Sequence, residues 1–406
     1  MSNTFWKSFS VLIKSIFGPC EEYNRMFKYE CLNGNIDLVN VFLLFVDYDP
    51  TDDDNLTICL ASENGHVTVV NRLLQDRTGR VDPSVNNNYA IRWASQNGHA
   101  DVVDRLLQDG RVCTSDDVNY AIRWASRNGH IAVVDRLLQE DRTDPSADNN
   151  YPIRWASRNG HIAVVDRLLQ EDRTKNRVDP TADDNYAIRW ASEIGHIAVV
   201  DRLLQDVTGR VDPSVYNNYA IRWASENGHV AVVDRLLQEG RVYPSADNNY
   251  AIRWASRNGH IAVVDRLLQE GRVDPSTDEN CAIRYASERG HIAVVERLLQ
   301  EPKNRVDPSA DNNYAIRAAS GNGYNAIVER LLQDRRVDPS ADNNYAIRIA
   351  SENGHKAVVE RLLQDRRVDP SADNKSSSQE THNKKHNKKH NKKHNKKHNK
   401  KHKKKH

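Results

Sequence analysis

A Gly-His dipeptide recurs along this chain at steps of 31 to 35 residues, and no other feature restricts the fold as strongly. With one earlier unit around Asn33-Gly34-Asn35, about eleven similar units lie between Cys20 and Asn374. Such a chain needs no single core, because each unit can cover the hydrophobic face of its neighbour. The periodicity therefore predicts a solenoid. The second residue of the dipeptide, or its replacement, is His66, His99, His130, His161, His196, His229, His260, His291, Tyr324 and His355.

Differences in unit length are confined to one loop. Residues 151–170 align without a gap with 89–108, 186–205 and 345–364. The insertions lie between the glutamine that ends this block and the following Pro-Ser or Pro-Thr. Loops tolerate insertions and packed faces do not. The pattern indicates rigid units joined by a variable loop.

The first half of a unit has the features of a short helix. Pro152 suits the first position of a helix, where its missing N–H would be unpaired anyway. Ile153 and Ala156 lie three residues apart on one face, and the small alanine allows close helix approach. Gly160 can take the left-handed conformation that ends a helix.

The second half predicts another helix. Apolar residues recur over 162–169 at spacings of three and four, and we expect Asp166 and Arg167 to face solvent. Two helices of about ten residues cannot bury this stripe alone, so neighbouring units must cover it. The Asp-Pro-Ser that follows is typical of a turn between units.

The repeated motif resembles a known family. Ala-Ile-Arg-Trp-Ala-Ser-Arg-Asn-Gly-His followed by Val-Val-x-x-Leu-Leu is similar to the ankyrin consensus, over residues 20–374 and about ten times. The resemblance implies an all-α, ankyrin-repeat solenoid of about eleven helix-turn-helix units that binds other proteins. The Asp-Pro-Ser and Asn-Tyr-Ala-Ile-Arg segments resemble ankyrin arrays encoded by large DNA viruses of amoebae and by amoebae themselves.

Two columns depart from that consensus. Tyrosine replaces the threonine that caps the helix in the family, and we expect the preceding Asn88, Asn119 and Asn150 to cap instead. Arginine replaces the histidine that ties adjacent repeats. We favour structural pairing with carboxylates over a phosphate-binding ladder for this column, because the array is acidic. Its members are Arg92, Arg123, Arg154, Arg189, Arg222, Arg253, Arg284, Arg317 and Arg348.

The repeated histidines raise the question of metal binding or acid–base catalysis. Each follows a helix-ending glycine, so we interpret the pairs as structural turns. No His-Glu-x-x-His, phosphate-binding glycine loop or nucleophile–base pair stands outside the repeats. We therefore expect no enzyme, cofactor or metal site. The turn residues are Gly98, His99, Gly129, His130, Gly160, His161, Gly195, His196, Gly228, His229, Gly259, His260, Gly290 and His291.

A tryptophan column could pack between units or form a stacking platform. It comprises Trp93, Trp124, Trp155, Trp190, Trp223 and Trp254. Because it continues as Leu60, Tyr285, Ala318 and Ile349, we favour packing.

The two residues before the Gly-His glycine face the binding groove in ankyrin proteins. Here the first alternates in charge, and the second is nearly always asparagine, which suggests recent duplication or a repetitive ligand. The first residues are our candidate protein-binding groove: Gln96, Arg127, Arg158, Glu193, Glu226, Arg257, Glu288 and Glu352.

The two ends differ from the array. Residues 375–406 contain 14 lysines and one acidic residue, a charge of +13, whereas residues 1–374 carry −11. We expect this Lys/His/Asn-rich tail to be disordered and able to bind polyanions weakly, rather than to form a histidine metal edge. Residues 1–19 have apolar residues at helical spacing, which favours an amphipathic cap over a membrane-surface anchor.

Composition limits the setting in which the chain works. The five cysteines are scattered without a CxxC pair, and we find neither a signal peptide nor a membrane span. We expect an intracellular monomer, cytoplasmic or nuclear through its basic tail. The favoured function is a protein-interaction scaffold with a partner that sequence does not identify. The alternatives are polyanion or nucleic-acid association through the tail, and an adaptor to a host ubiquitin ligase.

Overall fold

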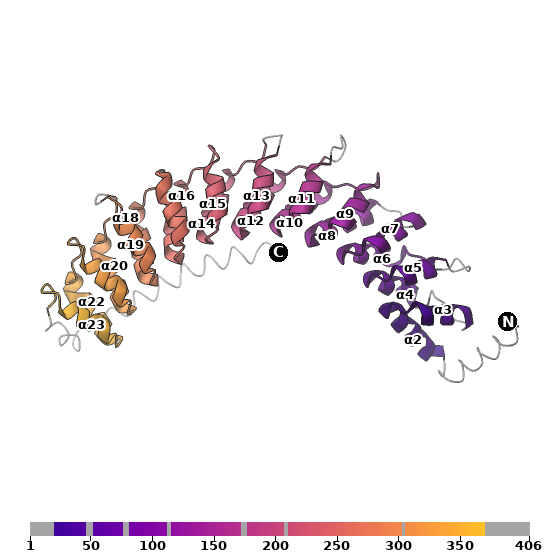
Figure 1. Cartoon of the computed structure of the whole chain (residues 1–406), viewed down its shortest axis with the longest axis horizontal. Coiled ribbons are helices and arrows are strands. Elements are labelled where there is room, and N and C mark those ends of the chain that lie inside the picture. Colours follow the sequence, from indigo (N-terminus) through magenta and orange to yellow (C-terminus); the bar gives the residue numbers. More distant parts are fainter. Residues whose placement is uncertain are drawn as a thin grey trace, which may run out of the picture. The chain divides into compact units, whose positions relative to one another are not determined.

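The computed structural model describes residues 20–45, 52–75, 81–111, 115–171, 177–206, 210–302 and 305–369. These residues form 22 α-helices and no strand, which confirms the predicted all-α repeat fold (Figure 1). Both the N-terminal segment 1–19 and the basic tail 375–406 lie outside the described residues.

The helices alternate between the first and second halves of the units. The first helices are α2 (Cys20–Asn33), α4 (Asp52–Glu63), α6 (Val85–Gln96), α8 (Ser115–Asn128), α10 (Ala147–Arg158), α12 (Ala182–Ile194), α14 (Val215–Glu226), α16 (Ala246–Asn258), α18 (Thr277–Arg289), α20 (Ala310–Gly321) and α22 (Ala341–Glu352). The second helices are α3 (Ile36–Phe45), α5 (Val67–Leu74), α7 (Ala100–Asp109), α9 (Ile131–Leu138), α11 (Ile162–Leu169), α13 (Ile197–Leu204), α15 (Val230–Leu237), α17 (Ile261–Glu270), α19 (Ile292–Leu299), α21 (Asn325–Leu332) and α23 (Lys356–Leu363).

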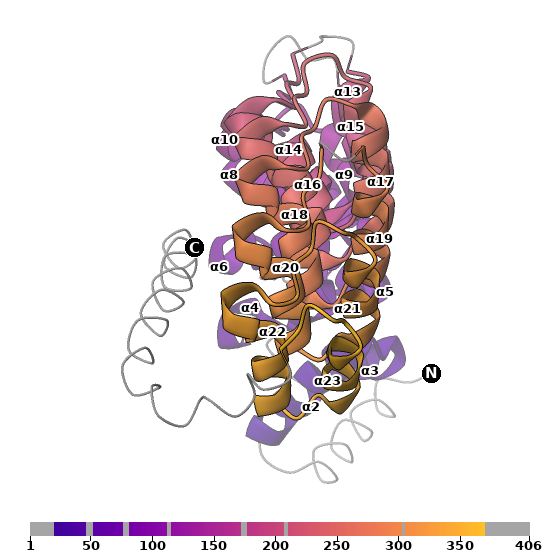
Figure 2. The ribbon, with the colours of Figure 1, turned by 90° about the vertical axis from the view of Figure 1, so that its left-hand side faces the viewer.

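Contacts divide the described residues into two compact groups, those up to 224 together with 231–242, and residues 225–230 together with those from 243 onward. Within each group the first helices pack against one another in one layer and the second helices in another (Figure 2). In the first group, for example, α6 packs on both α4 and α8, while α7 packs on α5 and α9. This arrangement covers the apolar stripe of each unit with its neighbours.

The core follows the predicted stripe. Ile153 and Ala156 of α10 and Val165 and Leu168 of α11 are fully buried. Because burying each large aliphatic side chain contributes about 1.5–3 kcal/mol, the repeated stripe is the main source of stability. Cys31, Cys59 and Cys281 are buried free thiols.

Asp166 and Arg167 face solvent in part, since 42% of the Asp166 side chain and 29% of the Arg167 side chain are exposed. Each also pairs with an adjacent unit. Arg167 Nε lies 2.8 Å from Asp135 Oδ1, and Arg202 Nε lies 2.5 Å from Asp166 Oδ1. These ion pairs therefore tie successive second helices together along the layer.

The first helices begin in an unusual way. Before the right-handed helix of α10 starts, Asp148, Asn149 and Asn150 all have positive φ angles of 54–59°. Asparagine and aspartate tolerate this left-handed conformation better than most residues. The same triple occurs in α6, α12, α14, α16, α18, α20 and α22.

The expected capping by the asparagine before the tyrosine was wrong. Asn150 Oδ1 accepts a hydrogen bond from the backbone N–H of Asp179 in the next unit, at 2.7 Å. Asn119 makes the equivalent bond to Asp144, at 2.7 Å, and Asn88 donates to the Asp117 carboxylate, also at 2.7 Å. These side chains therefore join neighbouring units and do not cap their own helix.

The arginine column stabilises these left-handed turns. Arg154 Nε donates to the carbonyl oxygen of Asn149 at 2.8 Å, and its Nη1 lies 3.1 Å from Asp183 in the next unit. Arg123 pairs with Asp148 at 2.9 Å in the same way. The expected pairing with carboxylates is confirmed at Arg123, Arg154, Arg253, Arg284 and Arg317, and carbonyl oxygens are additional acceptors.

Candidate functional site

The Gly-His turns lie where adjacent units meet at the ends of the first helices. His161 Nε2 is 3.0 Å from the carbonyl oxygen of Arg127, and Asn159 Nδ2 donates to the same oxygen at 2.7 Å. A Cβ atom on Gly129 would lie 2.5 Å from His161 Nδ1, so the histidine ring packs directly on the glycine. The histidine contact recurs at His66, His99, His130, His260, His291 and His355.

These contacts explain the uniform asparagine before each glycine. Its amide donates to the unit before it at Asn97, Asn128, Asn159, Asn258, Asn322 and Asn353. The asparagine column therefore has a structural role, and a repetitive ligand is not needed to account for it. The residue directly before this asparagine differs from unit to unit.

That preceding position is the predicted binding groove. The side chains of Gln96, Arg127, Arg158, Glu193, Glu226, Arg257 and Glu288 are half-buried at the ends of the first helices, and Glu352 is exposed. The groove residues are therefore only partly available to a partner. Most of them contact aromatic residues of their own or the next unit.

The tyrosine of the next unit is the first such contact. Arg127 Nη1 donates to the hydroxyl of Tyr151, and Arg158 Nη1 to the hydroxyl of Tyr186, each at 3.2 Å. Where the groove residue is acidic, the tyrosine is the hydrogen-bond donor instead: the Tyr314 hydroxyl donates to Glu288 at 2.9 Å. Tyr219 and Tyr250 donate likewise to Glu193 and Glu226.

A phenol both donates and accepts hydrogen bonds, so one tyrosine column accommodates a groove residue of either charge. Burial, followed by the hydrogen bond to Glu288, raises the pKa of Tyr314 to about 12. The hydroxyl therefore keeps its proton at neutral pH and can donate it. This role of the tyrosine is not evident from the sequence, although the tyrosine stands at a constant offset in nearly every unit.

The tryptophans are the second contact of the groove arginines. The Arg127 guanidinium lies 4.7 Å from the Trp124 ring and 4.4 Å from the Trp155 ring. Arg158 lies 4.7 Å from Trp155 and 4.2 Å from Trp190. Trp124, Arg127, Trp155, Arg158 and Trp190 therefore form an alternating stack across three units.

Tyrosine rings extend this stack, since Tyr151 packs on Trp155 with ring centroids 5.4 Å apart. The tryptophans are half-buried. They pack between units, as we favoured, but they are also partly accessible to solvent. The result is a firm surface of aromatic rings and guanidinium groups in the first group of units.

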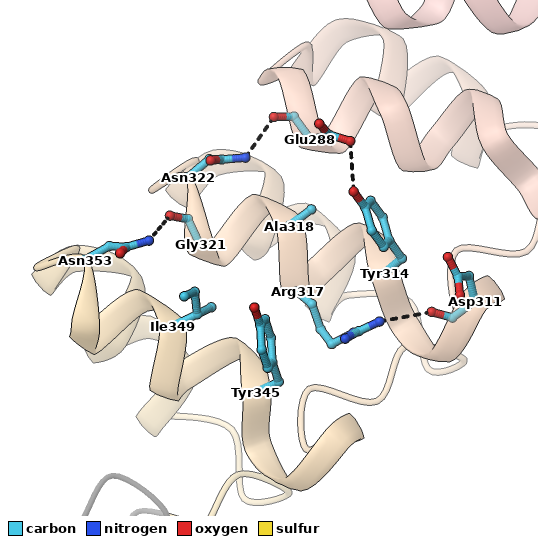
Figure 3. A pocket seen from close by; sticks show the side chains of 10 residues that line it. All are labelled: Glu288, Asp311, Tyr314, Arg317, Ala318, Gly321, Asn322, Tyr345, Ile349 and Asn353. Carbon is cyan, nitrogen blue, oxygen red and sulfur yellow. Dashed lines mark hydrogen bonds between the residues drawn. The ribbon is translucent and has the colours of Figure 1, made fainter. Parts of the chain in front are cut away.

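One hollow opens on the first helices of the second group. A pocket of about 560 Å³ lies on α20 and α22, where Ala318 and Ile349 replace tryptophan and Gly321 replaces the groove residue (Figure 3). Tyr314 and Tyr345 also line it. Small residues at two columns of one unit thus leave space that larger side chains fill elsewhere.

The described residues include neither a cluster of metal ligands nor a thiol with a lowered pKa. They contain no group of three or more His, Cys, Asp or Glu side chains placed to hold a metal ion. Burial raises the pKa of Cys31 and raises that of Cys59 to about 12, which keeps both thiols protonated and unreactive. No helix in this part of the chain is long and apolar enough to cross a bilayer.

Comparison with known families gives one match. The family model described as "Ankyrin repeats (3 copies)" matches residues 27–117, 153–247, 188–279, 221–312 and 283–374. No curated protein matches the chain significantly.

Proposed function

The chain belongs to the ankyrin-repeat family, and we propose that it is a non-enzymatic scaffold whose repeated groove surface binds a partner protein. Ankyrin repeats are generally protein-interaction modules. The observation that carries the proposal is the stack of Trp124, Arg127, Trp155, Arg158 and Trp190.

The composition of this stack supports binding to protein. Tryptophan, tyrosine and arginine are the residues most enriched among those that dominate interface energies. In the stack each ring or guanidinium group is held by its neighbours before a partner arrives. Binding then costs less side-chain entropy than it would with free side chains.

A partner can be sought by cross-linking capture from host-cell lysate with the full chain. The triple variant Arg127→Glu, Arg158→Glu and Glu226→Arg reverses the charge at three groove positions and removes both guanidinium groups from the stack, and it should weaken capture. The matched control is Arg142→Glu, an exposed loop residue, which should leave capture unchanged. Equal capture by wild type and triple variant would reject the groove as the binding surface.

The identity of the partner is a further part of the proposal. Because the Asp-Pro-Ser and Asn-Tyr-Ala-Ile-Arg segments resemble viral arrays of amoebae, we propose a host protein as the partner. The scattered cysteines and the basic tail support a monomer that works inside the cell, in the cytoplasm or the nucleus.

The basic tail supports a second function. Its 14 lysines within 375–406 favour weak association with nucleic acid or another polyanion, with the repeats then acting as a spacer. An adaptor to a host ubiquitin ligase is a special case of the scaffold proposal. Recovery of ligase subunits with the full chain would support it, and their absence from a capture that yields other proteins would reject it.

A further inference from the structure

The pocket on α20 and α22 differs from the groove elsewhere because the groove position of α20 has no side chain. In the first group, arginines at the groove position lie between aromatic rings and donate to a tyrosine hydroxyl of the next unit. The equivalent residue on α20 is Gly321, which has no side chain. The place that Arg127 and Arg158 fill with their own guanidinium groups is empty here.

Tyr345 shows the consequence of this change. It occupies the column of Tyr151 and Tyr186, whose hydroxyls accept a hydrogen bond from the groove arginine. Within the described part of the chain, the Tyr345 hydroxyl has no hydrogen-bond partner, because the residue that would supply one is Gly321. The Tyr345 side chain points from α22 toward α20 at the pocket (Figure 3).

The charge of the pocket favours a cation. Arg317 is paired with Asp342 at 2.9 Å, and Arg284 is paired with Asp311, so these charges are balanced. Glu288 accepts a hydrogen bond from the neutral Tyr314 hydroxyl. The nearest paired cation, Arg289 Nε, is 4.0 Å from Glu288, at the limit of an ion pair. The pocket therefore holds one carboxylate that is only weakly neutralised.

Arginine fits these walls better than lysine does. Its planar guanidinium stacks on aromatic faces and can donate to a carboxylate and a hydroxyl from different nitrogens at once. Ala318, Gly321 and Ile349 leave room for the aliphatic part of the side chain. An acidic side chain would instead be repelled by Glu288.

We propose that this pocket receives an arginine side chain of the partner protein, which lies against Tyr314 and Tyr345 and donates to Glu288 and the Tyr345 hydroxyl. The partner's arginine takes the place that Arg127 and Arg158 take within the chain. The inference rests on the scaffold function proposed above and assigns the pocket a role in selecting the partner.

The test uses the full chain and a short Gly-Ser peptide that contains one central arginine. Saturation-transfer NMR should detect binding of this peptide to the wild-type chain. The same peptide with citrulline, which keeps the shape and loses the charge, should bind about tenfold more weakly or not at all. The lysine peptide should also bind more weakly, because it lacks the planar fork.

Gly321→Arg should fill the pocket from within, in the manner of Arg127, and reduce peptide binding about tenfold or more. The matched control is Gly240→Arg, the same exchange at an exposed loop glycine where an added Cβ atom would meet nothing within 4 Å, and it should leave binding unchanged. Gly321→Arg should keep the wild-type helical circular dichroism signal, because arginine already occupies this column in three units.

Equal binding of the arginine and citrulline peptides would overturn the proposal, as would undiminished binding to Gly321→Arg or no binding at all. Preferential binding of a tryptophan peptide would assign the pocket to an aromatic side chain instead. Partner capture separates the two proposals. If Gly321→Arg captures the partner normally while the Arg127/Arg158/Glu226 variant does not, the pocket proposal fails and the scaffold proposal stands. If neither variant changes capture, both proposals fail.

Discussion

The guanidinium of Arg127 donates a hydrogen bond to the hydroxyl of Tyr151 in the next unit, and it also lies between the rings of Trp124 and Trp155. One side chain thus connects two units and orders the surface on which a partner would bind. Stability and recognition in this array depend on the same contacts.

Removing the guanidinium from this stack should change tryptophan fluorescence. In Arg158→Ala, Trp155 and Trp190 each lose a cation that covers one face, so we expect a red shift and greater quenching by iodide. The control is Arg167→Ala, which loses an ion pair with Asp135 on the second helices and contacts no tryptophan. Identical quenching of Arg158→Ala and wild type would show that the stack does not persist in solution.

Ser157→Ala should stabilise the array. Ser157 is fully buried on α10, and among the described residues its hydroxyl has no hydrogen-bond partner. Removing an unsatisfied buried hydroxyl in this way should raise the free energy of unfolding by about 1 kcal/mol, measured by urea denaturation. In the same unit Ser146 Oγ donates to Asp144 at 2.6 Å, so Ser146→Ala should destabilise. Destabilisation by both changes would mean that the Ser157 hydroxyl is satisfied.

Asn150→Ala should destabilise the array by roughly 1–3 kcal/mol, because it loses the bond to Asp179 and strains a left-handed position. Asn150→Gly keeps the backbone conformation without strain, so its free energy of unfolding should fall by less. Asn150→Asp keeps the acceptor oxygen and should be closest to wild type. Urea unfolding of the three variants gives this order directly. Equal losses of unfolding free energy in the alanine and glycine variants would show that strain at the left-handed position contributes nothing.

High pH should destabilise the protein through its half-buried tyrosines. Burial, followed by the Glu288 hydrogen bond, raises the pKa of Tyr314 from 10.0 to about 12. The unfolded chain therefore releases this proton at lower pH than the folded chain. The contribution of Tyr314 to the free energy of unfolding is complete below pH 10 and is lost as the pH rises toward 12. Tyr314→Phe should reduce the slope of the unfolding free energy against pH in this range. An unchanged slope would contradict the raised pKa.

Deletion of residues 375–406 should leave helical content and the melting temperature nearly unchanged, because the buried stripe lies in the repeats. The same deletion should abolish retention on heparin, and retention of the full chain should fall steeply with salt as counterions are released. Salt-insensitive binding of nucleic acid by the shortened chain would reassign polyanion binding to the repeats.

The helical unit could be predicted from the sequence because its signals are local. Apolar spacing in 162–169, the glycine that ends each first helix and the dipeptide period all act within a few residues of one another. They specify the helix pairs and their stacking whatever the exact contacts between units are. The constant asparagine before the glycine was visible as well, but its partner was not.

Only the tertiary structure decided which side chains meet. The hydrogen bond from Arg158 to Tyr186 joins residues 28 positions apart, and that from Asn150 to Asp179 joins residues 29 positions apart. Such pairs depend on the direction in which a left-handed turn or a helix end presents its side chain to the neighbouring unit. The spacing along the chain carries no such information. The pocket beside Gly321 has the same origin, since a missing side chain becomes a cavity only where the adjacent unit does not move in to fill it.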